Sequence, residues 1–100
     1  IENQVPLTYS LFEKDALIFK ELQSKNITVL ENDKPLLRVQ FDDFQNLGIW
    51  TKNNAPFLCI EPWLGYSDTV HSSGNILEKE GIQLLKAKKS LQCSFGIEIL

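Results

Sequence analysis

The chain has 100 residues, of which 43% are hydrophobic and 10% aromatic, a composition that supports the packed core of one domain. Its net charge is −3, and its ten Lys and Arg residues form no basic stripe with interleaved aromatic residues, which argues against nucleic acid as a partner. No stretch reaches the roughly eighteen consecutive apolar residues that a membrane-spanning helix needs, so we expect a soluble protein without a membrane partner.

The sequence contains no methionine and starts at Ile1 without a signal-like apolar run, so we interpret it as a piece of a longer protein. Its two cysteines, Cys59 and Cys93, occupy apolar positions and lack metal-ligand spacing. They favour a reducing compartment, and we expect a cytoplasmic protein; a disulfide between them is left open. We predict neither a cofactor nor a metal site.

The first predicted strand covers residues 16–19, after an irregular lead-in over residues 1–10. Asp15 stands at the mouth of this strand and is a candidate site residue. The alternative is a turn or helix-capping aspartate, which is the commoner use of Asp beside an apolar run.

Turn residues separate the next predicted strands, which cover residues 27–30, 36–41 and 47–51. A hairpin is the simplest connection between the first two. In the third, Gly48 permits a close approach to the backbone. Trp50 could stack on the apolar face of a sugar ring, although tryptophan is more often a core residue.

The central apolar run, residues 57–63, is expected to form a strand and carries an acid between apolar neighbours. Both of its faces are expected to be buried. Pro62 is expected to end the strand and to hold Glu61 in extended geometry. Desolvation beside Phe57 and Trp63 would raise the pKa of Glu61, as suits a general base; the alternative is a glutamate hydrogen-bonded to nearby backbone.

A long polar loop covers residues 66–80 and contains His71, the one histidine, to which we assign no role. Further strands are predicted at residues 81–85 and 90–99. In the second of these, alternate residues from Leu91 to Ile99 are expected to face the core. With no βαβ rhythm in the chain, the prediction is a mostly β fold, an antiparallel β-sandwich.

The sequence FLCIEPW at residues 57–63, with Gly65 and Asp68, resembles the signature of the aldose 1-epimerase (galactose mutarotase) superfamily, most closely its bacterial LacX-like branch. Further matches, in order, are at residues 11–12, 15–19, 48–50 and 79–82. The resemblance implies that residues 1–100 are the C-terminal portion of one galactose mutarotase-type supersandwich domain, with the remainder upstream.

By this resemblance the protein is an isomerase of carbohydrate metabolism that interconverts the α and β anomers of a hexose. Glu61 falls on the catalytic base, and Asp15 falls near an aspartate that holds a sugar hydroxyl. Trp63 and Trp50 become candidate walls of the sugar pocket. The catalytic histidine of the family lies upstream of this chain, so the piece alone is expected to be inactive.

Two other functions are left open. One is a carbohydrate-binding β module without turnover, and the other is a hexose-6-phosphate epimerase. The latter needs cationic side chains converging on phosphate, whereas Arg38 is the one arginine. Whether the complete protein forms a homodimer, and which sugar it uses, is also left open.

Overall fold

The computed structural model describes residues 3–100, which form short strands and two single-turn 3-10 helices. The elements follow one another as η1 (Tyr9–Phe12), β1 (Leu17–Phe19), β2 (Asn26–Glu31), β3 (Lys34–Gln40), β4 (Asn46–Trp50), β5 (Cys59–Trp63), η2 (Ile76–Glu78) and β6 (Gly96–Ile99). Residues 1 and 2, the start of the predicted lead-in and of the predicted domain, lie outside the described residues.

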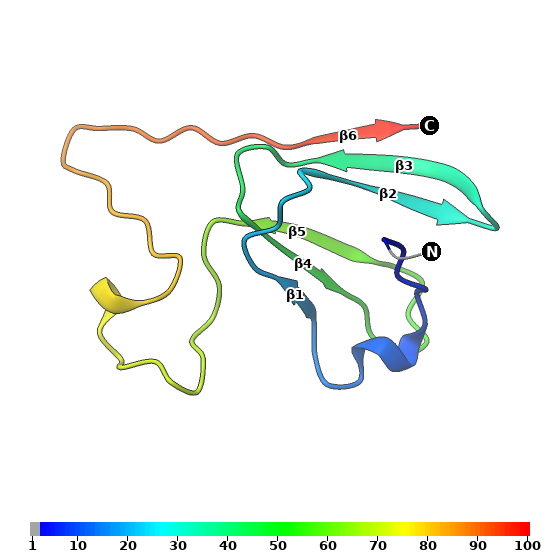
Figure 1. Cartoon of the computed structure of the whole chain (residues 1–100), viewed down its shortest axis with the longest axis horizontal. Helices are drawn as coiled ribbons and strands as arrows, with labels where there is room; N and C mark the ends of the chain where they lie inside the picture. The colour runs from blue at the N-terminus through cyan, green and yellow to red at the C-terminus, as the bar shows by residue number, and fades with distance from the viewer. Residues whose placement is uncertain (1–2) are drawn as a thin grey trace.

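The strands make two antiparallel sheets of three strands each, in the orders β1-β4-β5 and β2-β3-β6. In Figure 1 the hairpin of β2 and β3 lies with β6 in one layer, and β1, β4 and β5 lie in the other. The predicted mostly β, antiparallel fold is confirmed.

The core lies between the two sheets. Phe41 and Leu47 are fully buried and Val39 is nearly so, and they are packed against partly buried residues of both sheets, including Phe19, Ile27 and Ile60. In β4 and β5 the inner residues are Leu47, Ile49 and Ile60, which alternate with residues on the outer face. The alternation expected from the sequence therefore sets the inner and outer faces of this sheet.

The hairpin between β2 and β3 turns at Asn32 and Asp33, which both have positive φ (50° and 64°). Two central residues with positive φ are the signature of a type I′ turn, whose twist matches that of the flanking strands. The predicted hairpin is confirmed.

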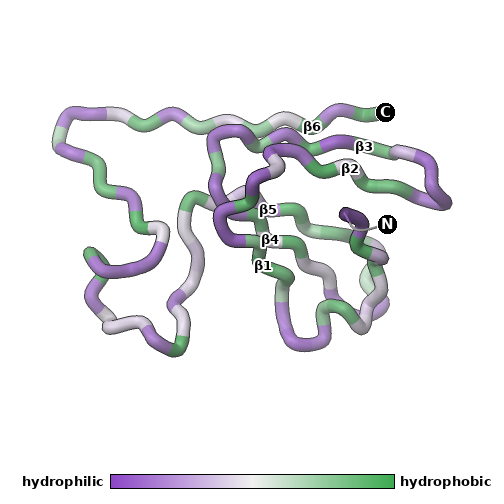
Figure 2. Tube along the Cα trace, in the orientation of Figure 1, coloured by the Kyte–Doolittle hydropathy of each residue, from purple (hydrophilic) through white to green (hydrophobic). Residues whose placement is uncertain are grey.

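The C-terminal part departs from the prediction. Residues 81–85 form no strand, and only residues 96–99 of the predicted strand 90–99 pair with a neighbour, namely β3. Residues 64–95 add no strand to either sheet and form a long excursion, along which hydrophobic positions recur (Figures 1 and 2). The prediction of strands failed here because an apolar alternating run becomes a strand only where a second strand is there to accept its hydrogen bonds.

The expected inward face of β6 needs the same correction. Ile97 and Ile99 pair with Val39 and Leu37, so they share the core-side face of their sheet. They are nevertheless 60% and 79% exposed, and Leu91 and Phe95 are also exposed. The predicted inward face of β6 is therefore the correct one, but the opposite sheet does not cover it.

Candidate functional site

The candidate site lies on the outer face of the β1-β4-β5 sheet. The register places Ile18, Gly48 and Glu61 in one row across the three strands, with Trp50 paired to Cys59 in the next row. Successive residues alternate between faces, so Trp50, Glu61 and Trp63 all belong to the face opposite the core. Three of the four predicted site residues therefore share one surface.

Trp63 lies against Gly48 on this face. A Cβ atom built on Gly48 would lie 2.6 Å from Cη2 and 2.7 Å from Cζ2 of the indole. Because Gly48 pairs with Glu61, the indole extends back along the sheet toward the row that holds the carboxylate. Glycine in β4 thus provides the space for an aromatic wall beside Glu61, the close approach that the sequence predicted.

Glu61 is exposed, which corrects the expectation that both faces of this strand are buried. Phe57 is exposed as well and precedes the strand, which begins at Cys59. Within residues 3–100 no hydrogen bond or ion pair engages the Glu61 carboxylate, so the alternative of a backbone-bonded glutamate is not what the structure shows.

Pro62 does not end the strand as predicted, because β5 continues to Trp63 and Pro62 pairs with Leu47. β5 is an edge strand of its sheet, where a residue without an N–H donor is tolerated. The carboxylate of Glu61 is therefore held on a paired strand, with paired residues on both sides of it.

Trp50 packs against Phe57, with ring centroids 5.6 Å apart and a tilt of 52°. Both side chains keep part of their surface accessible. Indole and phenyl rings present flat apolar faces, to which a sugar ring binds through its C–H groups. Together with Trp63 they form an aromatic surface on either side of Glu61 along β5.

Asp15 is exposed and stands two residues before β1, at the end of the sheet where Trp50 lies. Its Oδ1 accepts a hydrogen bond of 2.7 Å from the Ala16 N–H, and its backbone has a φ of 111°. This local hydrogen bond agrees with the alternative interpretation, in which Asp15 is a turn aspartate. Within the described residues no hydrogen bond joins Asp15 to Glu61.

A charged cluster that sequence analysis did not predict lies where β1 and β5 end. Glu80 Oε2 accepts a 2.7 Å bond from the Tyr66 hydroxyl and a 2.9 Å bond from Lys20 Nζ, which sits 4.7 Å from the centre of the Tyr66 ring. These contacts attach the excursion after β5 to the sheet. The sequence signal that could have found the cluster was the family match at residues 79–82.

The cluster shifts the pKa values of its own members. The hydrogen bond from Tyr66, followed by that from Lys20, lowers the pKa of Glu80 below its ordinary value. The hydrogen bond to Glu80 is the main cause that raises the pKa of Lys20 and also that of Tyr66. Around neutral pH the three groups are therefore a carboxylate, an ammonium and a neutral phenol.

A buried amide fixes the same end of the sheet. Asn46 is 3% exposed; its Oδ1 accepts from the Glu21 N–H at 3.0 Å and its Nδ2 donates to the Leu64 carbonyl at 3.0 Å. These bonds join the chain after β1 to the chain after β5. Burying a polar side chain is favourable only when it is bonded in this way.

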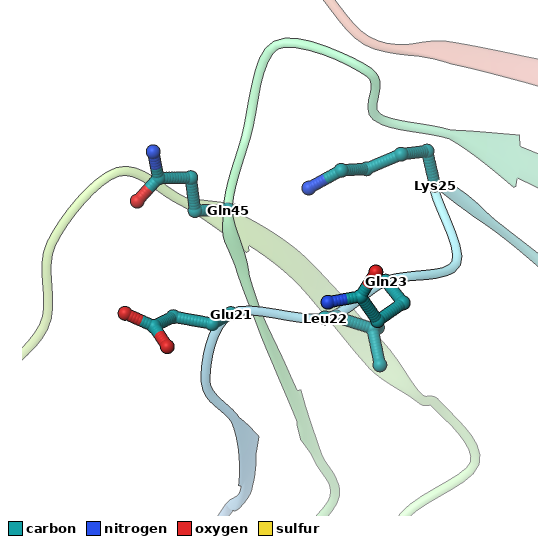
Figure 3. Close-up of a pocket in the computed structure, with 5 residues that line it drawn as sticks. All are labelled: Glu21, Leu22, Gln23, Lys25 and Gln45. Atoms are coloured by element: carbon teal, nitrogen blue, oxygen red, sulfur yellow. The ribbon is translucent and has the colours of Figure 1, made fainter.

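Two shallow cavities of about 290 Å³ each flank this end of the sheet. Figure 3 shows the first, lined by Glu21, Leu22, Gln23, Lys25 and Gln45. The Lys25 ammonium there donates to the Phe44 carbonyl at 2.9 Å. The second lies between residues 65–66 and 79–83 and includes Tyr66 and Glu80.

His71 is exposed in the excursion, and its backbone N–H donates to the Thr69 hydroxyl. Across residues 3–100, no three His, Cys, Asp or Glu side chains come together as metal ligands. Cys59 and Cys93 are free thiols. The described part of the chain contains no helix with the length and apolar character needed to cross a bilayer.

Comparison with known proteins gives two curated relatives from Lactococcus lactis subsp. lactis, the chromosomal and the plasmid LacX proteins. Each is 45% identical over 82 residues, which cover 78% of this chain. The chain is similar to LacX. It spans only 27% of the length of either LacX protein, and no family profile and no solved structure matches it. Resemblance to the LacX-like branch is thus confirmed, while the wider superfamily remains a prediction.

Proposed function

We propose that this chain carries the general base of an aldose 1-epimerase-like isomerase, with Glu61 as that base. The observation that carries the proposal is an exposed carboxylate on a paired strand, beside the Trp63 indole that covers Gly48. The sequence around it resembles the mutarotase signature, in which this position is the base. A carboxylate can remove a proton from a pyranose, and an aromatic surface beside it can pack against the apolar face of the sugar ring.

The proposed reaction begins when Glu61 takes the proton of the anomeric hydroxyl. The electron pair left on that oxygen forms the carbonyl as the bond between C1 and the ring oxygen breaks, and a general acid protonates the ring oxygen. After rotation about the C1–C2 bond, the reverse steps close the ring to the other anomer. Each such proton transfer contributes about 10² to 10⁴ in rate. By the family resemblance the general acid is a histidine outside this chain.

The other predicted site residues have binding roles in this proposal. Trp63 and Trp50 form walls against the apolar face of the sugar, and the second oxygen of Asp15 accepts from a sugar hydroxyl. Asp15 lies at the Trp50 end of the sheet, which makes it a contact to a distant hydroxyl rather than to the reacting carbon.

The proposal includes a larger domain, of which this chain is the C-terminal portion. Apolar side chains along the excursion and β6 are exposed, up to 94% at Val70, and the relatives are several times longer than the chain. Further strands of the same sandwich would bury these side chains and supply the general acid. The two free thiols fit the reducing cytoplasm as the place where this domain works.

A carbohydrate-binding module without turnover is the second candidate. It is favoured by the exposure of Glu61 and by the lack of any acid or base bonded to it within residues 3–100. A hexose-6-phosphate epimerase has less support, because Arg38 pairs with Glu98 at 3.0 Å and belongs to the other sheet.

The deciding experiment is polarimetric mutarotation of freshly dissolved α-galactose and α-glucose by the complete protein, with Glu61→Gln as the test variant. Glu31→Gln, an exposed glutamate of β2 on the other sheet, is the matched control. We expect Glu61→Gln to lose at least about a hundredfold in rate and the control to keep its rate.

Other outcomes of the mutarotation experiment would support a different function. Equal rates in the wild type and Glu61→Gln would remove Glu61 as the base. If the folded protein binds these sugars but accelerates neither, the binding module becomes the function. Acceleration with the 6-phosphates alone would support the third alternative.

A further inference from the structure

The cavity between residues 65–66 and 79–83 is built by two glycines that let the backbone segments meet. A Cβ on Gly65 would lie 3.1 Å from the Gly81 carbonyl oxygen, and a Cβ on Gly81 would lie 3.1 Å from Gly65 Cα. Gly81 also has a φ of +73°, a backbone conformation that residues with a side chain rarely adopt. Larger residues at these positions would push the two segments apart, so the shape of the cavity is set by the backbone.

The polar groups at this cavity are held in place and keep capacity for a ligand. Glu80 Oε2 accepts from Tyr66 and from Lys20, whereas its Oε1 has no hydrogen bond within residues 3–100. Gln83 Nε2 donates to the Gly81 carbonyl at 3.2 Å, and its side-chain oxygen likewise has no partner in the described part. The site thus offers two acceptor oxygens beside an aromatic ring.

Charge and size narrow the class of ligand. The charges around the cavity balance, because Lys20 is bound to Glu80 and Lys79 lies 3.6 Å from Asp68. An anion would meet the fixed Glu80 carboxylate, so the acceptor oxygens suit a neutral ligand with hydroxyl groups. A volume of about 290 Å³ is at the lower end for small-molecule sites, as expected for a single ring.

We propose that this cavity is a subsite for a neutral sugar ring, and that the substrate class is a reducing disaccharide or longer saccharide. This inference rests on the proposed function, in which the reducing ring lies at Glu61. Gly65 is four positions after Glu61, at most about 13 Å along an extended chain, which is within reach of a ring linked to the first. The ring in the cavity donates hydroxyl hydrogens to Glu80 Oε1 and to Gln83.

The cavity of Figure 3 is the natural comparison. It has a similar volume and also presents glutamine and glutamate side chains, but no aromatic ring lines it. No hydrogen bond within the described residues fixes its Glu21 carboxylate, in contrast to that of Glu80. The same change from glutamine to leucine can therefore be made in each cavity, and only the change in the proposed subsite is expected to weaken sugar binding.

The test measures binding to the complete protein by calorimetry, using glucose and the disaccharides maltose, cellobiose and lactose, which all have glucose as the reducing ring. We expect at least one disaccharide to bind about tenfold tighter than glucose, as hydrogen bonds to a second ring would give. Gln83→Leu should reduce that ratio of affinities roughly tenfold toward one. Gln23→Leu, in the cavity of Figure 3, should leave the ratio unchanged.

Failure of this inference is separable from failure of the proposed function. A ratio near one for all three disaccharides, or a ratio that Gln83→Leu does not change, overturns the subsite even if Glu61→Gln abolishes mutarotation. Loss of the ratio in Gln23→Leu instead would also overturn the subsite, because it would place the second ring at the other cavity. Glu80→Gln is a second variant. Its neutral amide cannot form the ion pair with Lys20 that holds this side chain in place, so it should also lower the ratio of affinities.

Discussion

At the scale of single residues, the contact between Gly48 and Trp63 decides the shape of the candidate site. The indole occupies the space that any side chain at position 48 would need. Trp63 therefore lies along the sheet beside the Glu61 row instead of projecting into solvent. The glycine was visible in the sequence, but its partner was not, because the pairing of β4 with β5 brings the two together.

Replacing Gly48 by alanine tests this contact. The new methyl group would force the indole to shift, and overpacking of this kind destabilises by about 1 to 3 kcal/mol. Gly96→Ala is the matched control, because a Cβ there meets nothing within 4 Å. Urea unfolding midpoints and tryptophan fluorescence of the two variants should differ; equal behaviour would mean that the indole does not lie on Gly48.

The Lys20–Tyr66–Glu80 cluster makes a prediction about pH. The pKa of Glu80 is lowered below 4.5, so its contribution to stability is present above that pH and is lost as the pH falls through the lowered value. The pKa values of Lys20 and Tyr66 are raised, above 10.5 and 10.0, so their contribution is lost as the pH rises through the raised values. The cluster is therefore intact between about pH 4.5 and 10.0.

We expect the urea midpoint of Glu80→Gln to fall below that of the wild type inside this pH window and to approach it outside. An absorbance titration of the phenolate, made in a Tyr9→Phe background so that Tyr66 alone is seen, gives an independent measure. Glu80→Gln should lower the pH at which Tyr66 ionises. An unchanged titration would show that the Tyr66 hydroxyl does not bind Glu80 in solution.

At the scale of elements, the β2–β3 hairpin is the part in which local sequence and structure agree best. Turn residues, β-branched strand residues and the inward positions of Ile27 and Val39 all favour the same register. The turn residues Asn32 and Asp33 adopt positive φ, which asparagine tolerates and glycine prefers.

Asp33→Gly would create the Asn-Gly pair that type I′ turns favour. We expect it to stabilise the protein by about 0.5 to 1 kcal/mol, because glycine has no steric penalty at positive φ. Asp33→Val, a β-branched residue at the same φ, should destabilise. Thermal melting of both variants is the measurement; a lower melting temperature for Asp33→Gly would argue against a type I′ turn.

At the scale of the whole molecule, the core between the two sheets is buried, whereas β6 and much of the excursion before it are exposed. β6 and the excursion before it expose more apolar surface than isolated surface residues explain, including Leu84 at 73%. Apolar patches of this kind mark surfaces that other protein covers. This is the structural reason to expect the rest of a sandwich to pack here.

The exposed apolar surface predicts that the chain alone and the complete protein differ in dye binding and in self-association. Alone, the chain should bind the dye ANS strongly and associate at high concentration, whereas the complete protein should do neither. Dye fluorescence and analytical ultracentrifugation test this. A monomeric chain with weak dye binding would mean that the excursion folds back on itself and that the proposed larger domain is unnecessary.

The sequence alone determined the strands whose signals are local. Alternation and turn residues located β1 to β5, the hairpin and the inward face of β6, because each depends on a few neighbouring side chains. The family resemblance, together with an acid between apolar residues, singled out Glu61. The position of Trp63 on the same face followed from the period of two.

Only the tertiary structure decided what covers each face. The alternation over residues 90–99 gives the core-side face of β6, yet burial requires an opposing layer, and residues 3–100 do not provide one. For the same reason Glu61 was expected to be buried and is exposed. The bond that joins Lys20 to Glu80 spans 60 positions of sequence, so alternation and turn residues could not have predicted it.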